Sequence, residues 1–261
     1  MLKTRIIPTL LIKDVALVKG ERFDNWRRVG APMQAVKVYN TRDVDELIVL
    51  DIDATREGRE PDYDLIGSLA RECFVPLCVG GGVRSVDTVR CLLRSGADKV
   101  CINTAAYESP GLIRDVAESF GAQCVVAGID ARVSNGGYEC YRDCGRTSCG
   151  CEPGEWAREL EALGAGEILV TSVERDGTMA GYDLDLTEQV SSSVEIPVIA
   201  SGGAGSYEDM LQAVKRARAS AVAASSLYLF TQSTPLEAKA YLAARGVPVR
   251  HTTITPLENG R

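Results

Sequence analysis

The sequence has almost no histidine: the one residue of this type, His251, lies in the C-terminal segment RHTTITPLENGR. Histidine is the usual general base at neutral pH and the commonest metal ligand. Its absence from the rest of the chain excludes a Ser-His-Asp triad and a histidine-rich metal site from the body of the protein. Any acid-base chemistry must therefore use carboxylates, lysines, cysteines or tyrosines.

The sequence also lacks a basic excess and long apolar runs. Its 29 Lys and Arg residues against 36 Asp and Glu residues give a net charge of −7, which argues against nucleic acid as a partner. No apolar run approaches the roughly 18 residues that can span a bilayer, and charges interrupt the N-terminal region where a signal peptide would be apolar. We therefore expect a cytoplasmic protein that does not bind membranes.

Cysteine, by contrast, is plentiful, with nine residues. Five lie in predicted strands or helices, where a reduced thiol packs as a small apolar group. These five are Cys73, Cys78, Cys91, Cys101 and Cys124. Because a cytoplasmic protein rarely holds disulfides, no disulfide framework is expected.

The other four cysteines fall together in the segment CYRDCGRTSCGC. They are Cys140, Cys144, Cys149 and Cys151. Their spacing lacks the C-x₂-C pairs of most structural zinc sites, so free thiols are expected, and zinc or an iron–sulfur cluster stays an alternative. The sequence predicts no metal and no cofactor.

Short runs rich in Val, Ile and Leu alternate along the chain with stretches whose apolar residues recur at helical spacing. Strands are predicted over residues 5–12, 46–52, 76–79, 99–103, 124–130, 167–172, 197–201 and 221–226. A helical pattern follows each of them, as in PMQAVKVYN and YDLIGSLARE. Eight strand–helix units in about 250 residues predict an α/β fold of the (β/α)₈ TIM-barrel type. A doubly wound open sheet is the competing fold, but it usually has fewer units.

The two halves of the chain resemble each other. PLCVGGGVRS at residues 76–85 matches PVIASGGAGS at 197–206, and DELIVLDID from Asp45 matches GEILVTSVE from Gly166 at the same offset. A repeat of half the chain length predicts two duplicated (β/α)₄ halves. We expect residues 1–250 to form this single barrel domain and residues 251–261 to form a C-terminal tail.

Loops of glycine and other small residues follow several predicted strands, at the end of a barrel where active sites lie. Their backbone N–H groups can approach an anion closely, and the helix that follows adds a favourable dipole. Two such loops, related by the repeat, predict a ligand with a phosphate at each end. The first phosphate cradle is expected to consist of Gly82, Asn103 and Thr104, and the second of Asp176 or Gly177, Gly203, Ala224 and Ser225. The alternative is that these glycines only form tight turns.

The chain resembles the cyclase subunit of imidazole glycerol phosphate synthase, HisF, in motifs that extend to about Arg250. These motifs are RIIP, DELIVLDI, VGGGVRS, GADKVCIN, ERDGT, GYDLDLT, PVIASGGAGS and GVPVR. The resemblance implies a duplicated half-barrel and a bisphosphate substrate, PRFAR, which the family converts with ammonia to imidazole glycerol phosphate and AICAR. It also implies a HisH-like glutaminase subunit on the N-terminal face, whose ammonia travels along the barrel axis.

The resemblance further implies a ring of charges at the ammonia entrance. Arg5, Glu46, Lys99 and Glu167 occupy the matching starts of four strands. Two acids and two bases can pair there without leaving a net buried charge. Positions 5 and 11 differ by an even number, so their side chains are expected on one side of the first strand, about 20 Å apart. One end of the barrel would then hold the gate and the other the reaction site.

In the family the active site uses two facing carboxylates, at the ends of the first and fifth strands. Such a pair can move protons in both directions when one partner is kept protonated. The fifth-strand acid is present as catalytic Asp130, but the first strand reads TLLIKDV, with Leu11 in place of its acid. Asp51 and Asp53, after the second strand, are candidates for a substitute, whereas Asp14 is too far along the chain.

The combination of LLI on the first strand with LDIDATRE after the second resembles a branch of the family associated with amidino-sugar modification. This resemblance implies a barrel that passes ammonia to a sugar-modifying amidotransferase, a third partner, instead of closing an imidazole ring. Two alternatives stay open. One is an ordinary histidine-pathway cyclase with a relocated acid, and the other is a related isomerase that shares the barrel and cradles but lacks the charged gate.

The loop DVALVKGERFDNWRRVGAP, residues 14–32, is long for a connection between a strand and a helix. We expect it to act as a lid over the site, with Lys19 facing the ligand. Val15 replaces a glycine of the family pattern, so the mobility of the lid is expected to differ.

Overall fold

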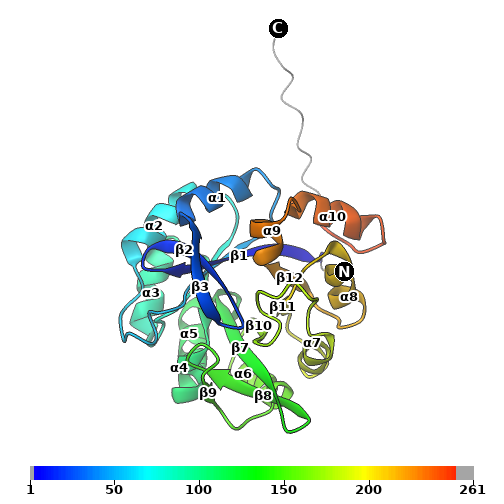
Figure 1. Cartoon of the computed structure of the whole chain (residues 1–261). Coiled ribbons are helices and arrows are strands. Elements are labelled where there is room, and N and C mark those ends of the chain that lie inside the picture. Colours follow the sequence, from blue (N-terminus) through cyan, green and yellow to red (C-terminus); the bar gives the residue numbers. More distant parts are fainter. Residues whose placement is uncertain (1–2, 251–261) are drawn as a thin grey trace.

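Eight parallel strands close into a barrel in the computed structural model, which describes residues 3–250 (Figure 1). They are β1 (Arg5–Lys13), β4 (Leu47–Asp51), β5 (Leu77–Gly80), β6 (Lys99–Ile102), β7 (Val125–Ser134), β10 (Glu167–Ser172), β11 (Val198–Ser201) and β12 (Ala221–Ala224). The ring closes because β12 pairs with β1 and β10 pairs with both β7 and β11. The predicted TIM barrel is confirmed and the open sheet is excluded. The predicted tail and His251 lie outside the described residues.

Helices surround the barrel. The longer ones are α1 (Pro32–Asn40), α2 (Tyr63–Glu72), α3 (Val86–Arg94), α5 (Gly111–Phe120), α6 (Pro153–Ala162), α7 (Leu184–Ser191), α8 (Tyr207–Lys215) and α10 (Pro235–Ala243). The short ones are α4 (Thr104–Glu108), α9 (Ser226–Phe230) and the 3₁₀ turn η1 (Ala122–Cys124). Ser85 and Ser206 are related by the sequence repeat. Their side chains accept hydrogen bonds from backbone N–H groups at the starts of α3 and α8. The repeat thus fixes where these two helices begin.

Side chains alternate along each barrel strand between the helices and the barrel axis. On β1, Leu10 packs in the outer apolar layer, whereas Ile7 faces the axis. Its neighbours there are Ile48, Cys78, Cys101, Val126, Leu169, Ile199, Ala221 and Ala223, which we call the axial column. Arg5 lies below Ile7, and Leu11 lies above it in the pocket, as the even spacing predicted.

Two antiparallel hairpins extend barrel strands at their C-terminal ends. Residues 14–32 were expected to be a loop, but they contain β2 (Ala16–Glu21) and β3 (Asp24–Gly30), and β2 pairs with the end of β1. The second hairpin joins the end of β7 to β8 (Gly137–Arg142) and β9 (Thr147–Ser148).

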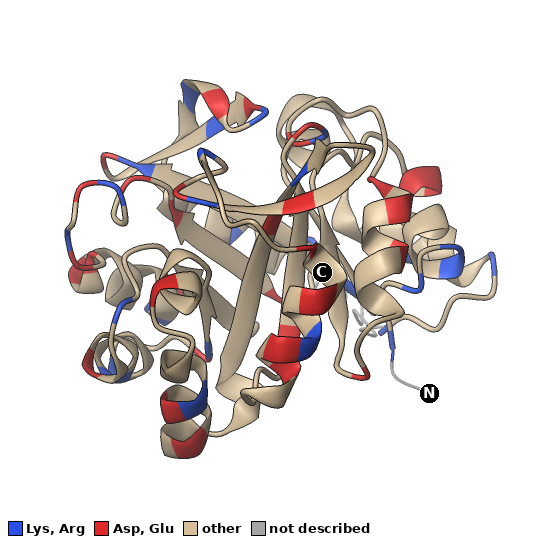
Figure 2. Ribbon diagram, turned by 90° about the horizontal axis from the view of Figure 1, so that it is seen from below, with Lys and Arg blue, Asp and Glu red and all other residues tan. Residues whose placement is uncertain are grey.

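In the view of Figure 2, acidic and basic positions are interspersed over the outer helices and loops. Within residues 3–250, no helix combines the length and apolar character that crossing a membrane requires.

Candidate active site and charged ring

Four charged side chains meet at the N-terminal end of the barrel strands. Arg5 Nη1 lies 2.6 Å from Glu46 Oε2 and 3.1 Å from a Glu167 carboxylate oxygen. Lys99 Nζ lies 2.9 Å from Glu46 Oε2 and 3.1 Å from Glu167 Oε1. Each cation therefore bridges both acids, and the four residues form a charged ring. The structure brings together the residues that the sequence placed here, and their role as a gate stays a prediction.

Glu46 is the most shielded member of the charged ring, at 1% exposed, whereas the side chains of Arg5, Lys99 and Glu167 are 22%, 15% and 14% exposed. Burial lowers the pKa of Arg5, but the charges of Glu167 and Glu46 outweigh this effect and the net shift is upward. The guanidinium therefore keeps its charge. Equal numbers of acids and bases leave the ring neutral, which limits the cost of holding ions in this place.

The axial column separates the charged ring from the pocket at the other end of the barrel. Cys78 is fully buried, and burial together with the nearby Cys101 thiol and Glu46 raises its pKa well above the usual value. Cys101 lies at the floor of the pocket, where burial, and to a smaller extent the charge of Asp130, raises its pKa to about 12. Both thiols are therefore neutral near pH 7. The column connects the charged ring to Asp130 through apolar and weakly polar groups.

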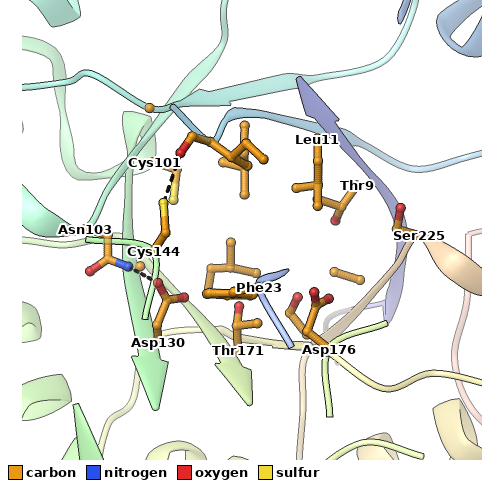
Figure 3. Close-up of a pocket in the computed structure, with 18 of the residues that line it drawn as sticks. Thr9, Leu11, Phe23, Cys101, Asn103, Asp130, Cys144, Thr171, Asp176 and Ser225 are labelled. Carbon is orange, nitrogen blue, oxygen red and sulfur yellow. Dashed lines mark hydrogen bonds between the residues drawn. The ribbon is translucent and has the colours of Figure 1, made fainter. Parts of the chain in front are cut away.

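The pocket opens at the C-terminal ends of the barrel strands (Figure 3). Leu11 lies on one side, and Asp130 lies across the pocket from it, because β1 and β7 are opposite strands of the ring. Phe23 and Trp26 of the β2–β3 hairpin also line the pocket. The hairpin therefore borders the site as a pair of strands, and its role as a lid stays a prediction.

Asp130 is the acid on which the chemistry of this pocket depends. Burial raises the pKa of Asp130 to about 7. A hydrogen bond of 2.8 Å donated by Asn103 Nδ2 opposes this shift, and the charge of Asp176 adds to it. A carboxyl group with a pKa near the working pH can both donate and accept a proton. Leu11, opposite it, can do neither.

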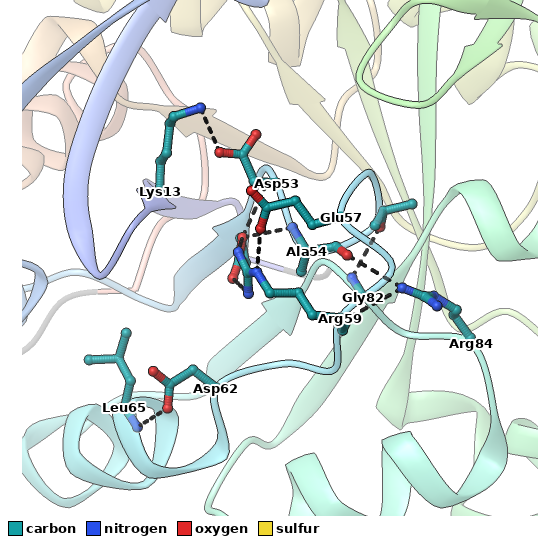
Figure 4. Close-up of polar contacts among 11 residues, drawn as sticks. Lys13, Asp53, Ala54, Glu57, Arg59, Asp62, Leu65, Gly82 and Arg84 are labelled. Atoms are coloured by element: carbon teal, nitrogen blue, oxygen red, sulfur yellow. Dashed lines mark hydrogen bonds and ion pairs between the residues drawn. The ribbon is translucent and has the colours of Figure 1, made fainter.

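The two candidate substitute acids are held by ion pairs at the end of β4 (Figure 4). Asp51 accepts hydrogen bonds from Arg59 Nη1 at 2.8 Å and Nη2 at 3.0 Å, and from two backbone N–H groups of the next loop. Asp53 lies 2.6 Å from Lys13 Nζ and 3.4 Å from Arg56 Nη2. Asp51 lines the pocket and Asp53 does not. Neither offers a carboxylate that is free to face Asp130.

Asp176 and Lys19 form a buried ion pair that joins the hairpin to the loop after β10. Lys19 Nζ lies 2.8 and 3.0 Å from the two carboxylate oxygens of Asp176, and Lys19 is 2% exposed. The backbone N–H of Arg22 also donates to the Asp176 carbonyl at 2.8 Å. Lys19 lines the pocket, and its ammonium group is bound to Asp176. The expectation that Lys19 faces a ligand stays a prediction.

All residues of the two predicted phosphate cradles line the pocket. In the second cradle, Gly177 and Gly203 have φ angles of +78° and +106°. A Cβ atom would lie 2.3 Å from the Gly20 carbonyl oxygen at position 177 and 2.2 Å from the Gly181 carbonyl oxygen at position 203. Both glycines are thus required by backbone conformation and close packing, so the tight-turn interpretation holds for them whether or not they bind phosphate.

The cysteine cluster divides into two groups. Cys140, Cys149 and Cys151 lie together, because the Cys140 N–H donates to the Cys151 carbonyl and the Cys149 N–H to the Cys140 carbonyl, both at 2.9 Å. The neighbouring Cys140 thiol lowers the pKa of Cys151. Cys144 instead lines the pocket and donates to the Ile52 carbonyl at 3.0 Å. Across residues 3–250, no three His, Cys, Asp or Glu side chains are placed to hold a metal ion.

A comparison with protein families bears on the identity of the chain. The model of the family described as "Histidine biosynthesis protein" matches residues 5–232, from β1 to just beyond α9. The chain belongs to the histidine biosynthesis protein family. Barrels of both the HisA and the HisF type fall in this family, so membership alone does not distinguish cyclase, isomerase and ammonia-carrying subunit. Within the histidine biosynthesis family, the charged ring and Leu11 are the features that bear on this choice.

Sequence reasoning missed several residues in and around the pocket. Thr55 lines it next to the first cradle, and Thr9 lies beside Leu11 on the barrel wall. Arg59 lies behind the first cradle, where its carbonyl oxygen is close to Gly82. The unusual segment LDIDATREGREP was visible in the sequence. Its contact with Gly82 was not, because these residues are brought together only by the pairing of β4 with β5.

Proposed function

We propose that this histidine biosynthesis family member is a HisF-type barrel subunit that receives ammonia from a glutaminase and passes it to a sugar-modifying amidotransferase. One observation carries the proposal: a complete charged ring at the barrel floor is combined with a pocket in which Leu11 faces Asp130. The four charges of the ring support an entrance for ammonia, and Leu11 supplies no acid opposite Asp130.

The axial column supports passage of ammonia over passage of ammonium. Moving an ion through apolar surroundings is costly unless it is paired, whereas a neutral molecule of this size loses far less. The column ends at Cys101, below Asp130. Ammonia that entered at the charged ring would therefore emerge in the pocket beside this acid.

Ring closure requires proton transfer on both sides of a bound substrate, and each acid must lie within hydrogen-bond reach of the atom it serves. Asp130 lines the pocket on one side and can take this role. On the other side Leu11 has no titratable group, and the carboxylates of Asp51 and Asp53 are engaged by arginine and lysine. This arrangement supports transfer of ammonia to another acceptor.

A second candidate function is the ordinary cyclase, which converts PRFAR and ammonia to imidazole glycerol phosphate and AICAR. It is favoured by Asp176, which lies in the same pocket, close enough for its charge to raise the pKa of Asp130. Asp176 follows β10, the neighbour of β7, so it stands beside Asp130 and not opposite to it. Its carboxylate is also bound to Lys19 Nζ at 2.8 Å.

The proposal is tested by mixing the chain with a HisH-type glutaminase and measuring glutamine hydrolysis. A complex is expected to form on the N-terminal face, and Lys99→Met, which opens the charged ring, is expected to change the hydrolysis rate at least fivefold. Lys37→Met is the matched control, because Lys37 forms only an exposed pair with Glu72. Absence of a complex, or equal effects of the two substitutions, would argue against a gated conduit.

A further inference from the structure

Two of the cysteine thiols contact each other instead of the backbone. Four other thiols each donate a hydrogen bond to a carbonyl oxygen, and they belong to Cys73, Cys124, Cys144 and Cys149. The thiols of Cys140 and Cys151 share a hydrogen bond, which raises the pKa of Cys140 and lowers the pKa of Cys151. Two thiols in contact are the arrangement from which a disulfide forms.

The backbone holds these two residues at the spacing of a disulfide. The Cys140 N–H donates to the Cys151 carbonyl at 2.9 Å, and residues joined in this way across two strands lie roughly 5–6 Å apart at Cα. Disulfides usually join Cα atoms about 4.4–6.8 Å apart. Cys149 is adjacent as well, but its thiol donates to the Thr147 carbonyl. A bridge between Cys140 and Cys151 therefore requires no rearrangement of the two chain segments.

The two thiols differ in their access to solvent. Cys140 is 0% exposed and packs in the outer apolar layer. Cys151 is half-buried and immediately precedes Glu152, the capping residue of α6. Its lowered pKa favours the thiolate, which is the form that attacks a disulfide. A reagent from solvent therefore meets Cys151 first, and Cys140 is placed to attack second.

The pair stands at the base of a loop that reaches the pocket. Between the two cysteines, the Asp143 N–H donates to Thr104 Oγ1 at 3.2 Å, and Cys144 lines the pocket (Figure 3). Asp143 and Cys144 have φ angles of +54° and +56°, a conformation that residues other than glycine adopt at an energetic cost. Because contacts around the loop must offset this cost, a covalent bond across its base would hold the loop in place.

We propose that Cys140 and Cys151 form a redox site, at which a small-molecule disulfide such as oxidised glutathione creates a reversible bridge that fastens residues 141–150 beside the pocket. The Cys151 thiolate attacks one sulfur of the reagent and releases the first glutathione thiolate. The Cys140 sulfur then attacks Cys151 Sγ and releases the second. The protons lost by the two cysteines pass to the two glutathione thiolates, so two cysteine thiols are oxidised and one reagent disulfide is reduced. The site does not depend on the proposed function.

The test is oxidation of the purified chain with excess oxidised glutathione, followed by digestion after arginine and mass spectrometry. Cleavage after Arg142 and Arg146 separates VSNGGYECYR, which holds Cys140, from TSCGCEPGEWAR, which holds Cys151. We expect these peptides to be joined in a product two hydrogens lighter, and dithiothreitol to separate them again. Unlinked peptides, or glutathione attached at the exposed Cys91 alone, would overturn the proposal.

Two substitutions in the same loop identify the bridged thiol. Cys151→Ser removes the attacking thiol and is expected to slow formation of the link at least tenfold. Cys149→Ser is the matched control and is expected to change the rate less than twofold. Equal effects, or a link that is lost in Cys149→Ser and kept in Cys151→Ser, would overturn the assignment. Circular dichroism confirms that each variant is folded.

Hydrogen exchange measures the effect of the bridge on the loop. Exchange of the backbone N–H groups in residues 141–150 is expected to slow at least fivefold in the oxidised chain and to recover after reduction. Residues 16–30, in the other hairpin, are the internal control and are expected to exchange equally in both forms. Equal exchange of residues 141–150 in the two forms would contradict the fastening role of the bridge.

Discussion

Lys99 holds the two acids of the charged ring together, so its loss is expected to destabilise the barrel. Lys99→Met keeps most of the apolar stem but removes the ammonium group, and Glu46 and Glu167 then share Arg5 alone. Breaking a buried ion pair costs about 3–5 kcal/mol, because it leaves an unpaired charge away from water. Glu46 is 1% exposed, whereas the Glu167 side chain is 14% exposed and can draw on solvent. We therefore expect a loss of about 3 kcal/mol in the free energy of unfolding.

Thermal and urea unfolding measure this loss. For a domain of this size, about 3 kcal/mol corresponds to a fall in Tm of roughly 6–12 °C. The control Lys37→Met removes a pair of 3.4 Å whose side chains are 57% and 45% exposed, and it is expected to cost less than about 1 kcal/mol. Adding Glu167→Gln to Lys99→Met restores the balance of charge and is expected to recover part of the stability. A Lys99→Met protein as stable as the Lys37→Met control would refute the description of the ring as a buried ionic unit.

Three further predictions concern the mouth of the barrel. Asp130→Asn is expected to increase the free energy of unfolding above pH 7 by up to about 4 kcal/mol and to leave it unchanged below pH 4. The reason is that burial raises the pKa of Asp130 to about 7. As the pH rises from about 3.9, the pKa of an unfolded Asp, to about 7, the wild-type protein therefore loses free energy of unfolding that the variant keeps. Parallel curves of the free energy of unfolding against pH for the two proteins, measured with urea from pH 4 to 8, would contradict this. Lys19→Met leaves Asp176 unpaired, and hydrogen exchange in residues 16–30 is expected to accelerate at least tenfold; unchanged exchange would show that the pair does not fasten the hairpin. Gly81→Ala places a Cβ atom 2.1 Å from the Asp51 carbonyl oxygen at a φ of +98°. It is expected to lower the free energy of unfolding, measured with urea, by about 2–4 kcal/mol. A loss below about 1 kcal/mol would show that the turn can relax.

The barrel itself could be predicted because strand and helix periods differ and recur. PMQAVKVYN and YDLIGSLARE coincide with α1 and α2 residue for residue. Each segment has apolar residues at helical spacing, and each helix begins at a recognisable residue, Pro32 for α1 and the capping Asp62 for α2. The charged ring, in contrast, was predicted through the resemblance to HisF, because the residues alone read as ordinary solvated strand ends. The even spacing of positions 5 and 11 and the repeat that relates Glu46 to Glu167 agree with that prediction.

The β2–β3 hairpin and the contacts of Lys19 could not be predicted in the same way. The residues of β3, the outer strand of the hairpin, are mostly exposed and show no regular apolar alternation. Lys19 and Asp176 are far apart in the sequence, and only the closed barrel brings the hairpin to the loop after β10. Likewise, the sequence marks Gly82 as a possible phosphate ligand but cannot show that Thr55 occupies its N–H group.

The most direct measurement of the central claim is the formation of imidazole glycerol phosphate from PRFAR with a saturating ammonium salt, because free ammonia removes the need for a glutaminase. With Leu11 opposite Asp130, the account predicts no product above the background without protein. Product at an ordinary enzymatic rate that is lost in Asp130→Asn would contradict it, and would show that another acid of the pocket completes the pair.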